Sequence, residues 1–244
     1  MVPASVPIFI ITCDRLGVLR ESIASYREHI RTPFEIVIHD NGSTYQPLLA
    51  YLEELEGSGV AVYRHAERIV AQEQLNGVAG TVARWFAGRA PGNYVVTDPD
   101  VALVGDCGDI LELYAHLLET AGEIEVVGPM LRIDDLPDCY PLKAEVIERH
   151  MKQFWHKSPL ELTWRGRRIG YQHARIDTTF GMYRAGFRFR RLCRGYRTYA
   201  PYWARHLDWY IDPQRLSGDQ EHYLRHASRV THWGGARLAR SLSR

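Results

Sequence analysis

The sequence of 244 residues predicts an α/β fold in which helices flank a mainly parallel sheet. Three observations lead to this prediction. Short apolar runs rich in β-branched residues alternate with segments whose apolar residues recur every three or four positions. Polar turn residues follow the apolar runs. The chain is 45% hydrophobic and 24% charged, which is sufficient to bury one sizeable core, and it is too short for two full domains.

The elements follow in order along the first half of the chain. Pro7 to Thr12 is a β-branched apolar run and predicts a buried strand. Leu19, Ile23 and Tyr26 then recur at helical spacing and predict a helix with one apolar face. The same reasoning predicts further strands at 34–38, 60–63, 94–97, 125–128 and 177–183, and further helices around 48–55, 74–87, 110–118 and 218–226. After residue 128 the period weakens, and we expect an irregular C-terminal half.

Composition limits the class of protein. The longest apolar run lies around Ile8 to Ile11, far short of the roughly 18 residues that span a bilayer. No charged-then-apolar leader opens the chain. The four cysteines are widely spaced and form no Cys-x-x-Cys motif, which favours reduced thiols over a structural zinc or a redox pair. We therefore expect a soluble cytoplasmic protein.

Charge is distributed unevenly along the chain. The net charge is +1, but residues 1–122 carry −8 and residues 123–244 carry +9. Seven arginines and no acidic residue lie between Thr178 and Leu207. This pattern indicates either a region that handles an anionic ligand or a solvated arginine-rich surface.

An aspartate follows each of three predicted strands. In parallel sheets, ligands bind beyond the carboxyl ends of the strands, so the loops at 12–15, 40–44 and 98–100 are candidates for a site. Asp98 and Asp100 lie one residue apart after the strand at 94–97, and two carboxylates can hold Mg²⁺ or Mn²⁺. Neither a P-loop nor a dinucleotide fingerprint is present, so phosphates would be handled by metal and arginine.

Three segments carry a resemblance to a known family, and they are PIFIITCDR, EIVIHDNGS and YVVTDPDV. They resemble nucleotide-sugar-dependent glycosyltransferases of the GT-A fold, and glycosyltransferase family 2 in particular. The resemblance covers residues 6–105. It implies a single GT-A domain over 1–233, with a nucleotide-sugar-binding half (1–105) and an acceptor half (106–233), followed by a basic tail at 234–244.

The resemblance also assigns residues. It implies that the loops after the first two strands hold the base and ribose of a nucleotide-sugar donor, with a UDP-sugar favoured, and that the Asp-x-Asp motif binds ribose and a Mn²⁺ or Mg²⁺ bridging the diphosphate. The donor-binding residues are then Thr12, Asp14, Arg15, Asp40, Asn41, Asn76 and Asp98. A histidine near the C-terminus would join Asp98 and Asp100 as a metal ligand, with His206 preferred to His232.

The catalytic base is less well defined. Inverting members of the family carry a pair of acidic residues on the acceptor side, and residues 178–207 contain none. Asp177 is the preferred candidate and Asp208 the next, with the group Asp219 to Glu221 as a further alternative. Retention of configuration without a dedicated base stays open.

The stretch from Phe180 to Arg205 is rich in arginine and contains eight aromatic residues. Aromatic faces stack on sugars and arginines bind phosphate, which favours a glycan acceptor, with lipid-linked and phosphorylated glycans among the alternatives. Peripheral contact with a membrane through the basic C-terminal region stays open, and no nucleic-acid partner is expected.

Two other functions compete with glycosyl transfer. One is nucleotidyl transfer to a sugar phosphate, which the loop Thr12 to Gly17 fits poorly because it lacks a glycine-rich G-x-G-T-R pattern. The other is a non-enzymatic module that uses the arginine-rich half to bind nucleic acid or an anionic surface.

Overall fold

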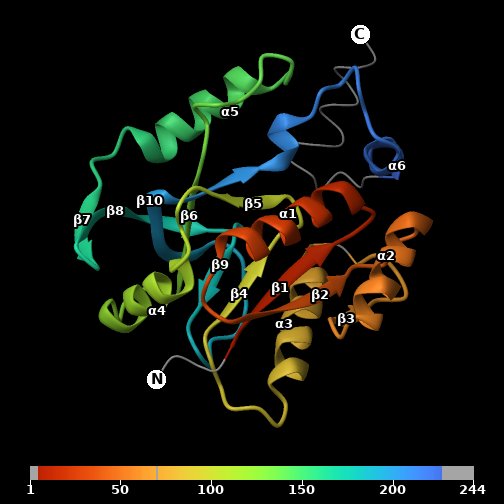
Figure 1. Ribbon diagram of the computed structural model, residues 1–244, viewed down its shortest axis with the longest axis horizontal. Coiled ribbons are helices and arrows are strands. Elements are labelled where there is room, and N and C mark those ends of the chain that lie inside the picture. Colours follow the sequence, from red (N-terminus) through yellow and green to blue (C-terminus); the bar gives the residue numbers. More distant parts are fainter. Residues whose placement is uncertain (1–4, 70, 227–244) are drawn as a thin grey trace.

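The computed structural model describes residues 5–69 and 71–226. One ten-stranded sheet runs through them in the order β3-β2-β1-β4-β9-β6-β10-β8-β7, and β5 pairs with β10 (Figure 1). The strands are β1 (Val6–Thr12), β2 (Phe34–Asp40), β3 (Ala61–Arg64), β4 (Tyr94–Thr97), β5 (Val101–Val104), β6 (Val126–Leu131), β7 (Leu160–Trp164), β8 (Arg167–Ile176), β9 (Gly181–Tyr183) and β10 (Cys193–His206).

Helices cover both faces of the sheet, as the sequence predicts. They are α1 (Leu16–His29), α2 (Gln46–Gly57), α3 (Ala71–Phe86), α4 (Ile110–Thr120), α5 (Lys143–His150), the π-helix η1 (Met151–Trp155), the 3₁₀-helix η2 (Leu207–Tyr210) and α6 (Gly218–His226).

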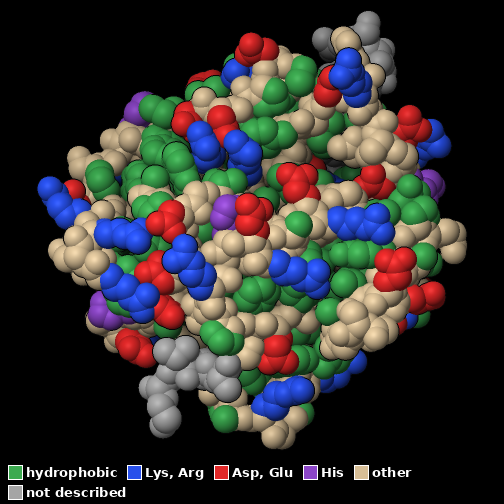
Figure 2. Space-filling view, in the orientation of Figure 1, with side chains coloured by type: hydrophobic (Ala, Val, Ile, Leu, Met, Phe, Trp, Pro, Cys, Tyr) green, Lys and Arg blue, Asp and Glu red, His purple; other side chains and the backbone are tan. Residues whose placement is uncertain are grey.

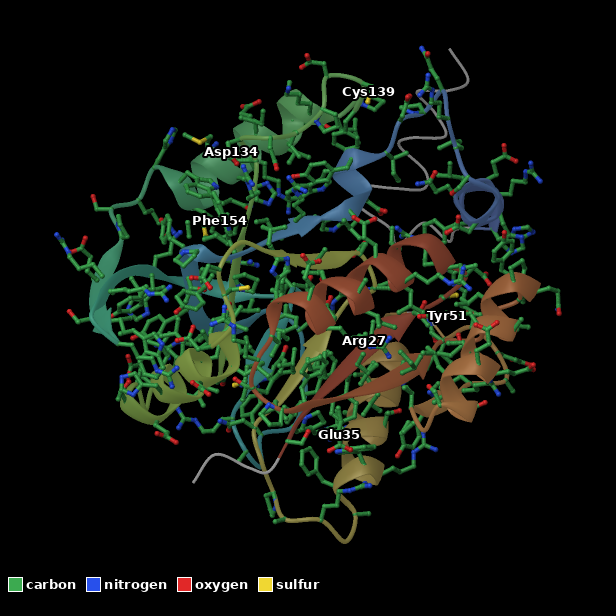
Figure 3. The ribbon with its side chains drawn as sticks, in the orientation of Figure 1. Arg27, Glu35, Tyr51, Asp134, Cys139 and Phe154 are labelled. Atoms are coloured by element: carbon green, nitrogen blue, oxygen red, sulfur yellow. The ribbon has the colours of Figure 1, made fainter. Side chains whose placement is uncertain are left out.

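Strand β1 lies between two hydrophobic clusters, because both of its faces are buried. Ile8 and Ile10 belong to the larger cluster, to which α1, α2 and α4 contribute. Phe9 and Ile11 point to the other face, where α3 packs. Side chains on successive strand residues alternate between faces, so a continuous apolar run is what a strand covered on both sides requires. Figure 3 shows how side chains fill the space between the helices and the sheet.

The first half of the sheet matches the predicted topology. Strands β3, β2, β1 and β4 all pair in parallel. Their C-terminal ends therefore lie at one edge of the sheet, where the sequence places the candidate loops.

The C-terminal half is more regular than the sequence analysis predicts. Strand β10 is 14 residues long and pairs in parallel with β6 and antiparallel with β5 and β8. The predicted strand at 177–183 is shorter, because only Gly181–Tyr183 pairs and the preceding residues form a loop. The sheet is therefore parallel at its N-terminal end and mixed beyond β4.

Some ion pairs join the acidic half of the chain to the basic half. Arg165 pairs with Asp109 and Glu112, and Arg167 pairs with Asp106. Basic and acidic side chains are interspersed on the face shown in Figure 2. The basic tail predicted at 234–244 lies outside the described residues. None of the described helices is long and apolar enough to cross a membrane.

Candidate metal centre and active site

The pairing of β5 with β10 forms the candidate centre. Its register places His206, the last residue of β10, opposite Val101, the first residue of β5. The backbone N–H of Leu207 then donates a 2.7 Å hydrogen bond to the carbonyl of Asp100. Two segments that are far apart in the sequence are thus joined directly beside the Asp-x-Asp motif.

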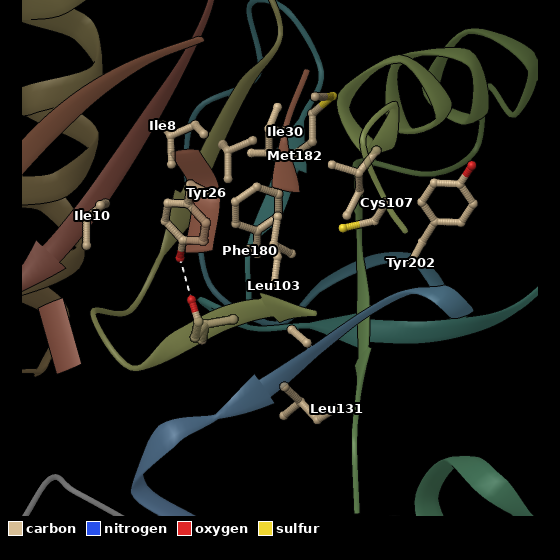
Figure 4. Close-up of a cluster of buried hydrophobic side chains, with 14 of the residues drawn as sticks. Ile8, Ile10, Tyr26, Ile30, Leu103, Cys107, Leu131, Phe180, Met182 and Tyr202 are labelled. Atoms are coloured by element: carbon tan, nitrogen blue, oxygen red, sulfur yellow. Dashed lines mark hydrogen bonds between the residues drawn. The ribbon is translucent and has the colours of Figure 1, made fainter. Parts of the chain in front are cut away.

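Helix α1 hydrogen-bonds to the segment 99–101, which carries the second aspartate of the motif. The Ser22 hydroxyl donates to the carbonyl of Pro99 at 2.7 Å, and the Tyr26 hydroxyl donates to the carbonyl of Val101 at 2.6 Å (Figure 4). Ser22 and Tyr26 lie one helical turn apart, on the face of α1 that packs on the sheet. The amphipathic helix predicted from the sequence therefore also fixes the loop that carries Asp100.

Asp100, His206 and Asp208 form a compact cluster of potential metal ligands. Each offers one ligand atom, and these atoms lie within 4.8 Å of one another. Asp100 Oδ1 and His206 Nδ1 are buried and have no hydrogen-bond partner. Carboxylate oxygens suit Mn²⁺ and Mg²⁺, an imidazole nitrogen suits transition-metal ions, and buried polar atoms without partners are costly unless a ligand satisfies them. The residues therefore fit a divalent cation.

The surroundings of the cluster are aromatic and charged. The His206 ring stacks on Trp209 with centroids 4.8 Å apart and planes 7° from parallel, which fixes its orientation. The Arg15 guanidinium donates to Asp208 Oδ1 and lies 3.7 Å from Asp100 Oδ2. Burial acts to raise the pKa of Asp208, but Arg15 outweighs it and holds that pKa below its ordinary value. Burial raises the pKa of Asp100.

Asp98 is not one of the three clustered residues. Residues 99 and 100 form a turn after it, and the neighbouring Asp100 acts with burial to raise the pKa of Asp98. Asp98 Oδ2 accepts a hydrogen bond from the Thr178 hydroxyl and lies 3.7 Å from the Arg191 guanidinium. Arg191 also bonds Asp177. The structure thus places Asp98 beside Asp177, and it places Asp208 with the potential metal ligands.

Thr12 and Asp14 follow β1 and have different surroundings. Thr12 Oγ1 is buried without a hydrogen-bond partner, which leaves it able to contact a ligand. Asp14 Oδ1 accepts hydrogen bonds from the backbone N–H groups of Thr44 and Tyr45, at 2.6 and 2.8 Å. Asp14 therefore has a structural task at the start of α2, whatever its part in donor binding.

The remaining donor candidates are spread over two places. Asp40 bonds Ser43 within its own loop, and burial raises its pKa. The side-chain amide of Asn41 both donates to and accepts from the backbone of Ile69, at 2.8 and 3.1 Å, and so clamps two loops together. Asn76 lies on α3, is exposed, and accepts a 3.4 Å hydrogen bond from Arg188. No described contact brings Asn76 to the cluster of potential metal ligands.

Most of the arginine- and aromatic-rich stretch builds the fold. Five of its eight aromatic residues are buried in the core, and they are Phe180, Tyr183, Phe189, Tyr196 and Tyr202. Several arginines have partners within the protein: Arg190 pairs with Glu125, Arg205 with Asp135, and Arg184 with two backbone carbonyls. These buried rings are therefore not available to stack on a sugar, and the stretch gives less support to a glycan acceptor than its composition suggests.

Helix α6 contributes residues that the sequence analysis does not assign to this site. The Tyr223 ring lies under the Arg15 guanidinium, 4.3 Å from centroid to Cζ, and Asp219 accepts a 2.7 Å hydrogen bond from the backbone N–H of Gly17. His222 Nε2 is 3.8 Å from Asp14 Oδ2. The sequence suggests Asp219 only as a base, and nothing in its local sequence indicates a contact with the loop after β1. The alternative ligand His232 lies outside the described residues.

A separate pocket of about 340 Å³ lies elsewhere on the sheet. None of its lining residues is a candidate for donor or metal binding; they are Ile124, His173, Ala174, Arg175, Arg194 and Gly195.

No family model and no curated protein matches the chain. Among solved structures it is similar to mannosyltransferase PcManGT from Pyrobaculum calidifontis in complex with GDP-Man and Mn²⁺, with 18% identity, a TM-score of 0.41, and coverage of 55% of this chain and 37% of that one. It is also similar to S. aureus TarS 1-349 in complex with UDP-GlcNAc, with 11% identity, a TM-score of 0.41, and coverage of 74% and 45%.

A third similar structure is glucosyl-3-phosphoglycerate synthase from Mycobacterium tuberculosis in complex with phosphoglyceric acid, with 16% identity, a TM-score of 0.36, and coverage of 58% and 50%. Each match spans half or less of the solved chain.

Proposed function

We propose that the protein is a GT-A-type glycosyltransferase that uses a divalent cation, Mn²⁺ or Mg²⁺, and a nucleoside-diphosphate sugar as donor. One observation carries the proposal. Asp100, His206 and Asp208 converge within 4.8 Å at the carboxyl edge of a parallel sheet, with buried ligand atoms on Asp100 and His206 that have no partner. The sequence resemblance over residues 6–105 supports a sugar nucleotide, with UDP favoured.

The cation would be held by Asp100, His206 and Asp208. When bound, it would neutralise charge that develops on the departing nucleoside diphosphate. The rest of the task falls to the protein. Thr12 Oγ1, buried at the end of β1 without a partner, is the candidate to hydrogen-bond the donor. Asp98, held by Thr178 and Arg191, is the candidate for the ribose hydroxyls.

Asp177 remains the better candidate for the base that removes the proton from the acceptor hydroxyl. Its side chain is 39% exposed, so an acceptor can approach it, and Arg191 holds it in one orientation. Asp208 is less suited, because it is buried and is one of the residues that would hold the cation. A glycan as acceptor rests on the arginine- and aromatic-rich stretch from Phe180 to Arg205, and lipid-linked and phosphorylated glycans both remain candidates.

Thermal unfolding with UDP, GDP, CDP, TDP and ADP, each with and without Mn²⁺, tests the proposal. A diphosphate at about 100 times its Kd adds about 2.7 kcal/mol, which for a chain of this length raises Tm by about 5–10 °C. We expect one diphosphate to produce this shift only with Mn²⁺, and Asp100→Asn to abolish it.

Asp106→Asn is the matched control, because Asp106 is exposed and pairs with Arg31 and Arg167 on the surface. It should leave the shift unchanged. The proposal would be refuted by the absence of any Mn²⁺-dependent shift, or by an Asp100→Asn protein that responds as the wild type does.

A further inference from the structure

Arg15 is a buried cation bonded to the potential metal ligands. Its guanidinium donates to Asp208 and lies 3.7 Å from Asp100, and both side chains in each of these pairs are under 10% exposed. The Tyr223 ring holds the guanidinium from α6. A buried arginine needs an anionic partner, and here the partners are two of the three residues that would ligate a metal.

A guanidinium and a divalent cation would compete for these carboxylates through their charge, although Arg15 lies against Asp208 Oδ1 and Asp100 Oδ2 and leaves Asp100 Oδ1 without a partner. The ligand atoms lie within 4.8 Å of one another, so a cation among them would stand close to Arg15 and repel it. A divalent cation and the guanidinium together carry three positive charges, and the two carboxylates neutralise only two of them. A diphosphate group supplies the missing negative charge, and arginine binds phosphate with charge-assisted hydrogen bonds.

We propose that Arg15 is the counter-cation of Asp100 and Asp208 when no metal is bound, and that it makes metal and donor binding cooperative. The divalent cation takes over the carboxylates that Arg15 holds, and the released guanidinium pairs with the donor diphosphate. Mn²⁺ alone therefore binds weakly, and a nucleoside diphosphate strengthens its binding. This inference rests on the proposed function, since it concerns the same cation and the same donor.

The experiment measures the Kd of Mn²⁺ from the free-Mn²⁺ signal in electron paramagnetic resonance, with and without saturating UDP, and with GDP in parallel. Arg15→Met removes the competing charge. We expect it to bind Mn²⁺ alone about tenfold or more tightly than the wild type, and to lose most of the strengthening by the nucleotide, since couplings of this kind are commonly about 5- to 150-fold.

Two further variants complete the design. Tyr223→Leu keeps Arg15 and removes the ring that holds it, so Mn²⁺ affinity without nucleotide should rise to a smaller extent; this variant also serves if Arg15→Met does not fold. Arg20→Met is the matched control, because Arg20 lies on α1 over the ring of Tyr51, at 4.5 Å, away from the acidic cluster (Tyr51 is labelled in Figure 3). Its Mn²⁺ affinity should equal that of the wild type.

The outcomes separate the two claims. If wild type binds Mn²⁺ through Asp100 but neither Arg15→Met nor Tyr223→Leu changes its Kd or its coupling to the nucleotide, the role of Arg15 is wrong and the metal centre stands. If folded wild type and folded variants all fail to bind Mn²⁺, with or without nucleotide, the metal-dependent function itself is wrong.

Discussion

Replacing Tyr26 by phenylalanine deletes one buried hydroxyl beneath the turn that carries Asp100. That hydroxyl donates a 2.6 Å hydrogen bond to the carbonyl of Val101. Because Leu207 donates to the carbonyl of Asp100, the next pair in the antiparallel ladder, His206 with Val101, is not hydrogen-bonded. The Val101 carbonyl therefore points away from β10 and depends on Tyr26.

The expected cost follows from burial. Tyr26 and Val101 are both at most 1% exposed, so water does not replace the lost hydroxyl. An unsatisfied buried acceptor costs about 1–3 kcal/mol, and we expect the free energy of unfolding to fall by about 2 kcal/mol. For a chain of this length that lowers Tm by about 4–8 °C. The loosened turn should also weaken Mn²⁺ binding.

Urea and thermal unfolding measure the first effect, and Mn²⁺ titration measures the second. Tyr94→Phe is the matched control, because the Tyr94 hydroxyl donates a 2.7 Å hydrogen bond to the carbonyl of Phe187, which is not among the potential metal ligands or their neighbours. It should lose stability and keep its Mn²⁺ affinity. The reasoning fails if Tyr26→Phe unfolds within about 0.5 kcal/mol of the wild type, or if both variants weaken Mn²⁺ binding equally.

Three other changes test the fold around the site. Burial lowers the pKa of His39 from 6.5 to about 3, so between these values the unfolded chain binds a proton that the folded chain does not. The free energy of unfolding should therefore fall as the pH drops through this window, by up to about 1.4 kcal/mol per pH unit, and urea unfolding of His39→Gln should show a shallower dependence; equal slopes would contradict this. Asp14 accepts the hydrogen bonds at the start of α2 and has a φ of 55°, so Asp14→Ala should lower the free energy of unfolding in urea by about 2 kcal/mol. Asp14→Asn should lower it by less, because asparagine tolerates a positive φ. An equal loss in both variants would refute the backbone argument. Gly195→Ala places a Cβ 2.1 Å from the Val126 carbonyl oxygen and should cost about 3 kcal/mol or more by the same measurement, whereas unchanged stability would contradict the close approach of β6 and β10.

The N-terminal half of the fold could be predicted because its signals are local. A strand buried on both faces needs an unbroken apolar run, and Pro7 to Thr12 supplies one. The helix that covers it needs one apolar face, which Leu19, Ile23 and Tyr26 provide. Neither signal depends on residues far away in the sequence.

Strand β10 could not be predicted because its signals come from its neighbours. It contains Arg197, which is buried and bonded to the carbonyl of Pro129, and Pro201, next to a shift in its pairing with β6. A buried arginine and an internal proline both argue against a central strand when read locally. Pairing with β5, β6 and β8 overrides them.

The site shows the same division. Residues at the ends of apolar strands, such as Thr12 and Asp98, lie at the edge of the sheet that their local sequence predicts. The motif groups Asp98 with Asp100, and only long-range pairing could show that Asp208 joins Asp100.

The position of β10 late in the chain also determines when the candidate metal site can form. Every strand of the parallel half, and every residue expected to contact the nucleotide, comes from the first hundred positions of the chain. His206 and Asp208 are synthesised about a hundred residues later and meet Asp100 only when β10 aligns with β5. Contacts so distant in sequence form late, because loop closure must be completed before they stabilise the chain. The whole parallel half of the sheet is therefore synthesised before two of the three potential metal ligands exist.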